Sequence, residues 1–125
     1  MIAYVGHDTG DATDKHGLAI TLSNEKSYTD WDTAMASCGS KAAVPGGKWS
    51  LLSRDQWDMM VKANGDINGL NAAIVNAGSY AINSRFWSAS EYDSDNKWYY
   101  DGYDNRWGWM NKTSRLNHAR ACLAF

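Results

Sequence analysis

The stretch Phe86–His118, which reads FWSASEYDSDNKWYYDGYDNRWGWMNKTSRLNH, decides the fold of this chain. Nine of its 33 residues are Phe, Trp or Tyr and eight are Asp or Asn, so aromatic runs alternate with turn-forming residues. Asp95 and Asn96 precede one aromatic run, and Asp104 and Asn105 precede the next. Short aromatic strands separated by such turns predict an antiparallel β meander.

The segment that begins near Thr29 has helical spacing. Its apolar residues recur at i, i+3, i+4 and i+7, which places on one helix face Trp31, Ala34, Met35 and Cys38. We expect Thr29 to be the N-cap and Gly39 to end the helix.

Two further helices are predicted before the aromatic stretch. Ser53 and Gln56 have the spacing of a capping box, and the buried face that follows consists of Trp57, Met60 and Val61, with Gly65 as the stop. A weaker helical pattern runs through Leu70, Ala73, Ile74 and Ala77 and ends at Gly78.

Apolar runs elsewhere predict strands. Ile2–Val5 and Leu18–Leu22 flank a polar loop at His7–His16, and Trp49–Leu52 forms a short strand. The final segment His118–Phe125 is typical of a strand buried in a sheet.

Helices first and a meander last indicate an α+β fold. We expect the two main helices to pack on one side of a twisted antiparallel sheet, leaving loops on the other side free to bind. The length of 125 residues predicts one domain.

Bulk composition excludes several classes of protein. The chain is 44% apolar, with 12 basic and 14 acidic residues, which argues against disorder and against a domain that coats nucleic acid. No apolar run approaches the roughly 18 residues of a membrane helix, and the N-terminal residues do not resemble a secretion signal, so we expect a soluble chain without membrane insertion. Seven Trp and seven Tyr against two Phe favour aromatic residues with a polar group, the type enriched in binding surfaces.

The sequence offers little chemistry for catalysis or metal binding. Two cysteines cannot by themselves supply the four ligands of a closed zinc site. Asp93–Lys97 starts like a calcium loop but lacks its glycine, so we interpret it as a turn. Glu91 with Asp93 or Asp101 could be a carboxylate pair for glycoside cleavage, but the sequence does not give the distance between the carboxyl groups. We expect no enzyme activity, no cofactor and no metal.

Three segments together carry a family resemblance: Lys48–Ser53 followed by Trp57, then Phe86–Tyr92, and finally Arg120–Phe125. Their order and spacing resemble the C-type-lectin-like variable proteins of diversity-generating retroelements, and also related bacterial surface domains. The resemblance runs from His16 to the C-terminus. In that family a reverse transcriptase rewrites the 3′ part of the gene at template adenines, which makes the C-terminal segment a diversifiable binding surface.

The resemblance implies that Tyr92 to His118 is the variable segment, with Trp98, Trp107 and Lys112 as fixed framework positions. Trp109 and Met110 depart from the pattern, because an Asn codon changed only at its adenines yields neither residue. From the resemblance and the paratope-like composition, we expect the ligand-binding residues to be Tyr92, Asp93, Asn96, Tyr99, Asp101, Tyr103, Asp104, Arg106, Trp109, Asn111, Thr113, Ser114, Arg115 and Asn117.

Several alternatives stay open at this stage. The resemblance implies an external protein or cell-surface ligand. We expect display on a virion or cell surface as part of a longer protein, and a homo-oligomer or larger assembly would be sensible because linked weak sites gain avidity. A fixed-specificity bacterial surface or carbohydrate-binding domain of the same fold is the alternative function. Nucleic acid ranks lower, because Asp93, Asp95, Asp101 and Asp104 lie in the same region as the basic residues. Comparison with C-type-lectin-like domains suggests a Cys38–Cys122 disulfide, and two buried thiols are the alternative.

Overall fold

The computed structural model describes residues 1–5, 17–45 and 47–125, and it has an α+β architecture. The predicted loop His7–His16 and Gly46 lie outside the described residues. Three helices are described: α1 (Trp31–Gly39), α2 (Arg54–Ala63) and α3 (Ile67–Asn76). None of the helices in these ranges is long and apolar enough to cross a membrane.

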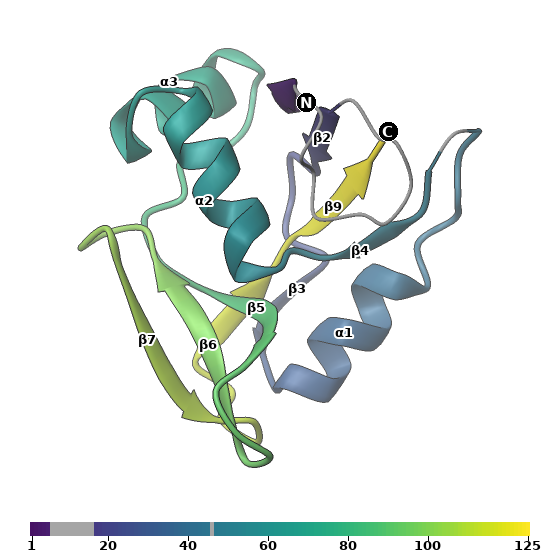
Figure 1. Cartoon of the computed structure of the whole chain (residues 1–125), viewed down its shortest axis with the longest axis vertical. Helices are drawn as coiled ribbons and strands as arrows, with labels where there is room; N and C mark the ends of the chain where they lie inside the picture. The colour runs from purple at the N-terminus through teal and green to yellow at the C-terminus, as the bar shows by residue number, and fades with distance from the viewer. Residues whose placement is uncertain (6–16, 46) are drawn as a thin grey trace.

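The strands form two sheets (Figure 1). One sheet has the order β1-β2-β9-β4 and consists of Ile2–Val5, Gly17–Ile20, Ala121–Ala124 and Trp49–Leu51. The other has the order β3-β8-β5-β6-β7 and consists of Lys26–Thr29, Asn117–Ala119, Arg85–Glu91, Asn96–Asp101 and Arg106–Asn111. All paired strands are antiparallel except β5 and β8, which run parallel. The predicted meander is therefore confirmed as β5-β6-β7.

The C-terminal segment joins the two sheets. It was predicted as one strand over His118–Phe125, but Arg120 divides it into β8, between β3 and β5, and β9, between β2 and β4. The prediction of a single strand is wrong, because an apolar alternation indicates burial and does not show which sheet supplies the partner.

Local sequence explains where α1 and α2 begin and end. Ser53 and Gln56 form the predicted capping box, each side chain accepting a hydrogen bond from the other's backbone N–H. The N-cap of α1 is Asp30 rather than the predicted Thr29, since Asp30 Oδ1 accepts from Thr33 N at 2.8 Å. Thr29 instead ends β3, where it pairs with Asn117.

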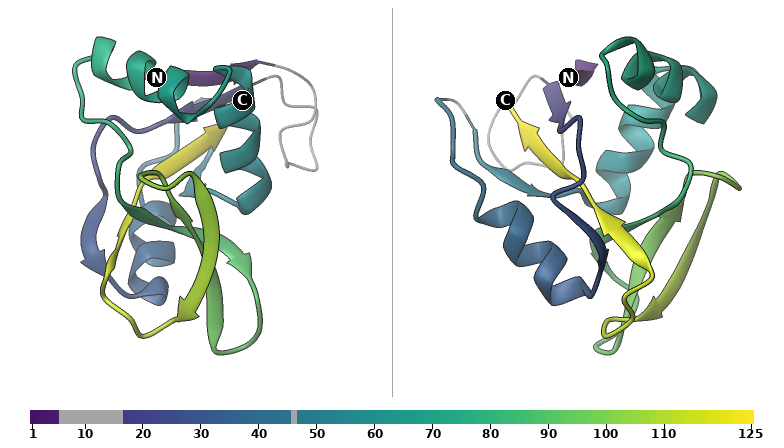
Figure 2. Two further views of the ribbon diagram at one scale, coloured as in Figure 1. Left: turned by 90° about the vertical axis from the view of Figure 1, so that its left-hand side faces the viewer. Right: turned by 180° about the vertical axis from the view of Figure 1, so that it is seen from behind.

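The two main helices lie on opposite faces of the strands they share, rather than on one side as predicted. In β5, Phe86 packs in the apolar cluster that contains Trp57 of α2, whereas its neighbour Trp87 packs in the cluster that contains Ala34 of α1. Consecutive residues of a strand point to opposite faces, so one strand supplies both clusters. The views in Figure 2 show α1 and α2 separated by the C-terminal strands.

The cysteines occupy different apolar clusters. Cys38 lies with α1 and Cys122 with α2, and both are free and buried. Burial raises the pKa of each thiol to about 12. The suggested disulfide is therefore not formed, and the alternative of two buried thiols is what the structure shows.

Candidate ligand-binding surface

The β6-β7 hairpin places aromatic residues side by side on one face. Trp98 pairs with Trp109 and Tyr100 with Trp107 in the strand register. Directly opposed residues of an antiparallel pair project from the same face, close enough for their side chains to touch. The Tyr100 and Trp107 ring centroids are 5.3 Å apart, and those of Trp98 and Trp109 are 5.5 Å apart.

Tyr92, from the turn after β5, completes a group that we call the aromatic patch: Tyr92, Trp98, Trp107 and Trp109. The Tyr92 ring stacks on Trp109 with centroids 4.3 Å apart and an angle of 9° between the ring planes. It also meets Trp98 edge-on at 5.4 Å. Tyr92 is 49% exposed and Trp109 is 50% exposed, so each ring rests on a neighbour and still presents surface to solvent.

Helix α2 supports the patch from its first turns. The Arg54 guanidinium lies 4.3 Å from the centre of the Trp98 ring and 5.1 Å from that of Trp107. One turn later, Asp58 Oδ1 accepts a hydrogen bond from Trp107 Nε1 at 3.1 Å. Residues four apart share a helix face, which is why both side chains reach the same part of the sheet. The patch is thus held by a cation over its rings and a carboxylate at one indole.

Tyr100 lies at the inner edge of the patch. Its hydroxyl donates to Asn105 Oδ1 at 2.7 Å, and its ring stacks on Trp57 of α2 at 5.5 Å. Burial raises the pKa of Tyr100 to about 12, with the nearby charges of Asp58 and Asp101 adding to the effect. Tyr100 therefore stays protonated and serves as a packing residue.

The opposite face of the hairpin is anchored by Lys97. This buried ammonium pairs with Glu91 and donates to the carbonyl oxygens of Asp93 at 3.0 Å and Ser94 at 3.2 Å. It also lies 4.6 Å from the centre of the Trp31 ring in α1. These contacts fix the β5-β6 turn from which Tyr92 projects.

Three of the expected site residues use their side chains to shape turns. Asp93 accepts hydrogen bonds from the Asn96 side chain and from the backbone N–H groups of Asn96 and Asp95, and these bonds lower the pKa of Asp93. The interpretation of this segment as a turn is confirmed. Asn96 Nδ2 donates to Asp93, and Asn111 Oδ1 accepts from the Thr113 backbone N–H and hydroxyl.

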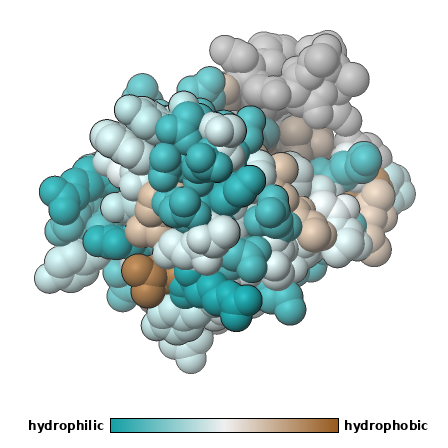
Figure 3. All heavy atoms as spheres, turned by 90° about the horizontal axis from the view of Figure 1, so that it is seen from below, coloured by the Kyte–Doolittle hydropathy of each residue, from teal (hydrophilic) through white to brown (hydrophobic). Residues whose placement is uncertain are grey.

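These two turns lie together at one end of the hairpin. The Lys112 backbone N–H donates to the Asp95 carbonyl at 2.8 Å, and Ser114 N donates to the Asn111 carbonyl within the second turn. Figure 3 views this end of the molecule, where hydrophilic and neutral colours cover most of the visible surface. The expected residues that the structure gathers near the aromatic patch or these turns are Tyr92, Asp93, Asn96, Trp109, Asn111, Thr113 and Ser114.

A second group lies at the far end of the hairpin. Tyr103 is 80% exposed, and Arg106 pairs with Asp104 at 3.5 Å on the surface. A strand of six residues spans about 17 Å, so Tyr103 lies far from the Tyr92–Trp109 stack. Arg106 is next to Trp107 in β7, but consecutive residues of a strand project from opposite faces. Asp101 is buried at this end, where its Oδ1 accepts from Tyr103 N and Asp104 N and its Oδ2 lies 3.6 Å from Arg85 Nε.

The remaining expected residues are dispersed. Tyr99 projects from the opposite face of β6, where its ring covers Gly108 and lies 5.1 Å from the Arg85 guanidinium. Arg115 lines a small pocket beside the start of α1. Asn117 is fully buried, and its Nδ2 donates to the Met110 sulfur at 3.3 Å.

Sequence reasoning missed the two residues that α2 contributes. Arg54 and Asp58 are far from the aromatic stretch in sequence, and only the packing of α2 brings them to it. One signal was present: a cation in the first turn of a helix is unfavourable beside the helix dipole, which suggests another role for Arg54. Within the described ranges, no three His, Cys, Asp or Glu side chains come together in a group that could hold a metal ion.

In comparisons with known proteins, no protein-family model matches the chain, and no curated protein matches it in sequence.

Proposed function

We propose that this chain is a C-type-lectin-like binding module, and that the aromatic patch with its two neighbouring turns recognises an external protein or cell-surface ligand. The observation that carries the proposal is the half-exposed Tyr92–Trp109 stack, braced by Trp98 and Arg54. Rigid, partly exposed aromatic side chains supply contact area at low entropic cost, and such residues dominate the energy of many interfaces. Asp, Asn, Ser and Thr residues in the adjoining turns supply polar contacts around the patch.

We further propose that the module is the variable protein of a diversity-generating retroelement. Asp93 and Thr113 are exposed and lie in turns beside the patch, and Asn111 is exposed at the end of β7; substitution at such positions disturbs the core least. The test is to sequence the gene and its downstream flank in a population of the source. Substitutions clustered in codons 92–118 at adenines of a nearby template repeat, beside a reverse-transcriptase gene, would support the proposal. An invariant segment without a template would reject it.

Two buried positions favour the second candidate, a carbohydrate-binding or surface domain of fixed specificity. Asp101 and Asn117 are among the residues expected to vary, yet Asp101 holds a turn and an ion pair and Asn117 is fully buried. Random replacement there would damage packing, which is easier to reconcile with a fixed sequence.

Binding to a defined glycan panel tests the second candidate directly. We expect chelator-insensitive binding that Trp109→Ala abolishes and that Tyr103→Ala, at the far end of the hairpin, leaves unchanged. Equal loss in both variants would exclude the aromatic patch as the glycan site.

A further inference from the structure

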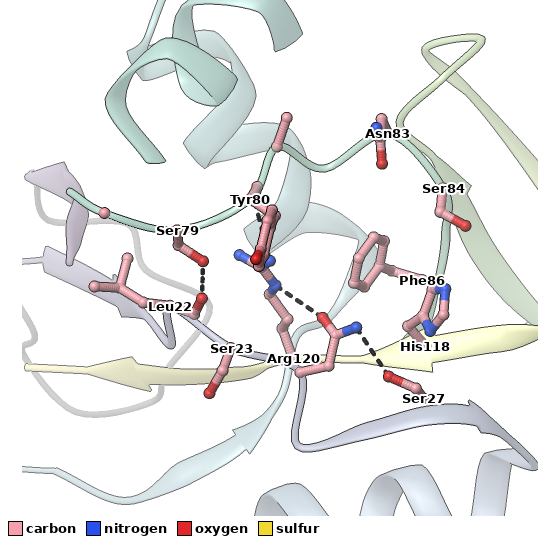
Figure 4. Close-up of a pocket in the computed structure, with 13 residues that line it drawn as sticks. Leu22, Ser23, Ser27, Ser79, Tyr80, Asn83, Ser84, Phe86, His118 and Arg120 are labelled. Carbon is pink, nitrogen blue, oxygen red and sulfur yellow. Dashed lines mark hydrogen bonds between the residues drawn. The ribbon is translucent and has the colours of Figure 1, made fainter. Parts of the chain in front are cut away.

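A pocket of about 630 Å³ lies on the molecule away from the aromatic patch. The β2-β3 connection forms one wall, the segment between α3 and β5 forms another, and Phe86, His118 and Arg120 complete the lining (Figure 4). Its size is within the range of small-molecule sites. None of its lining residues belongs to the aromatic patch or to the expected ligand-binding residues.

Arg120 is a buried cation in this pocket without a matching anion. Its side chain is 3% exposed, and it pairs with no carboxylate among the residues that the structure describes. Its hydrogen bonds go to neutral oxygens: the Asn24 side chain at 3.1 Å, and the Thr21 and Tyr80 carbonyls at 3.5 and 3.2 Å. A guanidinium has more N–H groups than these bonds use. A buried charge is costly unless it is paired, so the site is electrostatically incomplete.

His118 adds a second unsatisfied group. It is 9% exposed, and its buried Nδ1 has no hydrogen-bond partner. Its ring lies between Tyr28 at 4.6 Å and Phe86 at 5.4 Å, which fixes the imidazole in the pocket wall. Burial and then the charge of Arg120 lower the pKa of His118, so the ring is neutral near pH 7. His118 therefore adds no second charge, which leaves Arg120 as the one ionised residue in the described lining of the pocket.

The rest of the lining mixes polar residues with apolar ones such as Leu22 and Ala81, and among the described residues it includes no acid. Its serine and asparagine side chains include Ser23, Ser27, Ser84, Asn24 and Asn83. Glu25, which is adjacent in sequence, pairs with Lys41 instead. Ser79 Oγ donates to the Leu22 carbonyl and joins the two walls, and the 87% exposed Tyr80 stands at the rim.

We propose that this pocket binds a small sugar acid, with its carboxylate on the free guanidinium N–H groups of Arg120 and its hydroxyls on the serine and asparagine side chains. One carboxylate neutralises the single buried positive charge of Arg120, whereas a phosphate dianion would leave one of its two negative charges without a partner. Arginine and carboxylate also match in planar geometry. The volume exceeds what a bare carboxylate fills, and the hydroxyl and amide lining suits a polyhydroxylated body. This inference does not depend on the proposed function of the aromatic patch.

Titration of the isotope-labelled protein with D-glucuronate and with D-glucose tests the proposal, because the two sugars differ by carboxylate against hydroxymethyl. We expect glucuronate to shift backbone amide signals of Ser79–Ser84 and His118 and to bind at least about tenfold more tightly than glucose, the scale of one charge-assisted hydrogen bond. Equal affinity for the two sugars, or glucuronate shifts confined to other regions, would overturn it. Tighter binding of inorganic phosphate than of glucuronate would also overturn it.

A charge change at the rim tests the electrostatics without touching the buried Arg120. Asn83→Asp places a negative charge on an exposed lining position, and Asn68→Asp is a matched control on an exposed position of α3. We expect Asn83→Asp to weaken glucuronate binding severalfold and Asn68→Asp to leave it unchanged. The same affinity in both variants would count against the pocket as the site. Arg120→Met should abolish glucuronate binding while the amide spectrum of the variant stays native, which shows that the variant is folded.

Discussion

Replacing Tyr92 and Trp109 by alanine, singly and together, should reveal a coupling free energy of about 1 kcal/mol between them. The rings stack with centroids 4.3 Å apart, and about half of each side chain is buried. A buried aromatic side chain removes roughly 150–250 Å² from water, so half of that, at about 25 cal/mol per Å², gives at most about 3 kcal/mol for each residue. Trp98 touches both rings and accounts for part of this burial. The portion shared by Tyr92 and Trp109 is lost in either single variant and cannot be lost again in the double variant.

Urea unfolding followed by far-ultraviolet circular dichroism measures the four free energies without relying on the fluorescence of the altered tryptophan. A second cycle, between Tyr103→Ala and Trp109→Ala, serves as the control, because Tyr103 is 80% exposed at the other end of the hairpin. That pair should be additive within about 0.5 kcal/mol. Additivity in both cycles would refute the stacked arrangement and, with it, the idea that the aromatic patch is organised before it meets a ligand.

Three other predictions concern stability and reactivity. Gly102→Ala should lower the free energy of unfolding by about 1–3 kcal/mol or more, because an added Cβ would lie 2.2 Å from a backbone oxygen. Gly39→Ala has open space around the added Cβ and should have little effect in the same denaturation assay. The thiols of Cys38 and Cys122 should resist a thiol reagent until denaturant is added, and reductant should leave Tm unchanged; rapid labelling of the folded protein would contradict their burial. His118 has a folded-state pKa below its unfolded value of about 6.5, so the unfolded chain binds the proton more readily. The free energy of unfolding should therefore fall as the pH drops through that value. His118→Gln should flatten this pH dependence, and an unchanged slope would contradict the assigned role of His118.

The features that the sequence could predict are those set by neighbouring residues. The capping box of Ser53 and Gln56 depends on residues three apart, and it forms as expected. Strand β3 was not predicted, because Lys26–Ser27–Tyr28 is polar and exposed and Tyr28 has a positive φ of 51°. Its strand character comes from pairing with β8, a segment from the other end of the chain.

The residues of the candidate site likewise fall into those that the sequence could identify and those that it could not. The aromatic stretch pointed to Tyr92 and Trp109 from composition alone, and both are half-exposed. It also pointed to Asp101 and Asn117, which the fold buries, because Asx residues suit a turn or an interior hydrogen bond as well as a binding surface. The contact of Arg54 with Trp98 depends on tertiary packing, which no local pattern encodes, and so does the burial of Arg120 with no carboxylate partner among the described residues.

The placement of β8 and β9 at interior positions of the two sheets has a consequence for biosynthesis. A nascent chain that has emerged only as far as β7 holds β3 without β8 and holds β2 and β4 without β9, so neither sheet can close around its centre. Neither sheet can therefore be completed until β8 and β9 have emerged, because both are translated after all the strands with which they pair. A prematurely terminated or frameshifted product would expose unpaired strands to proteases and chaperones, so quality control would remove it. Substitutions at exposed turn positions such as Asp93 and Thr113 leave both sheets complete and would pass the same check.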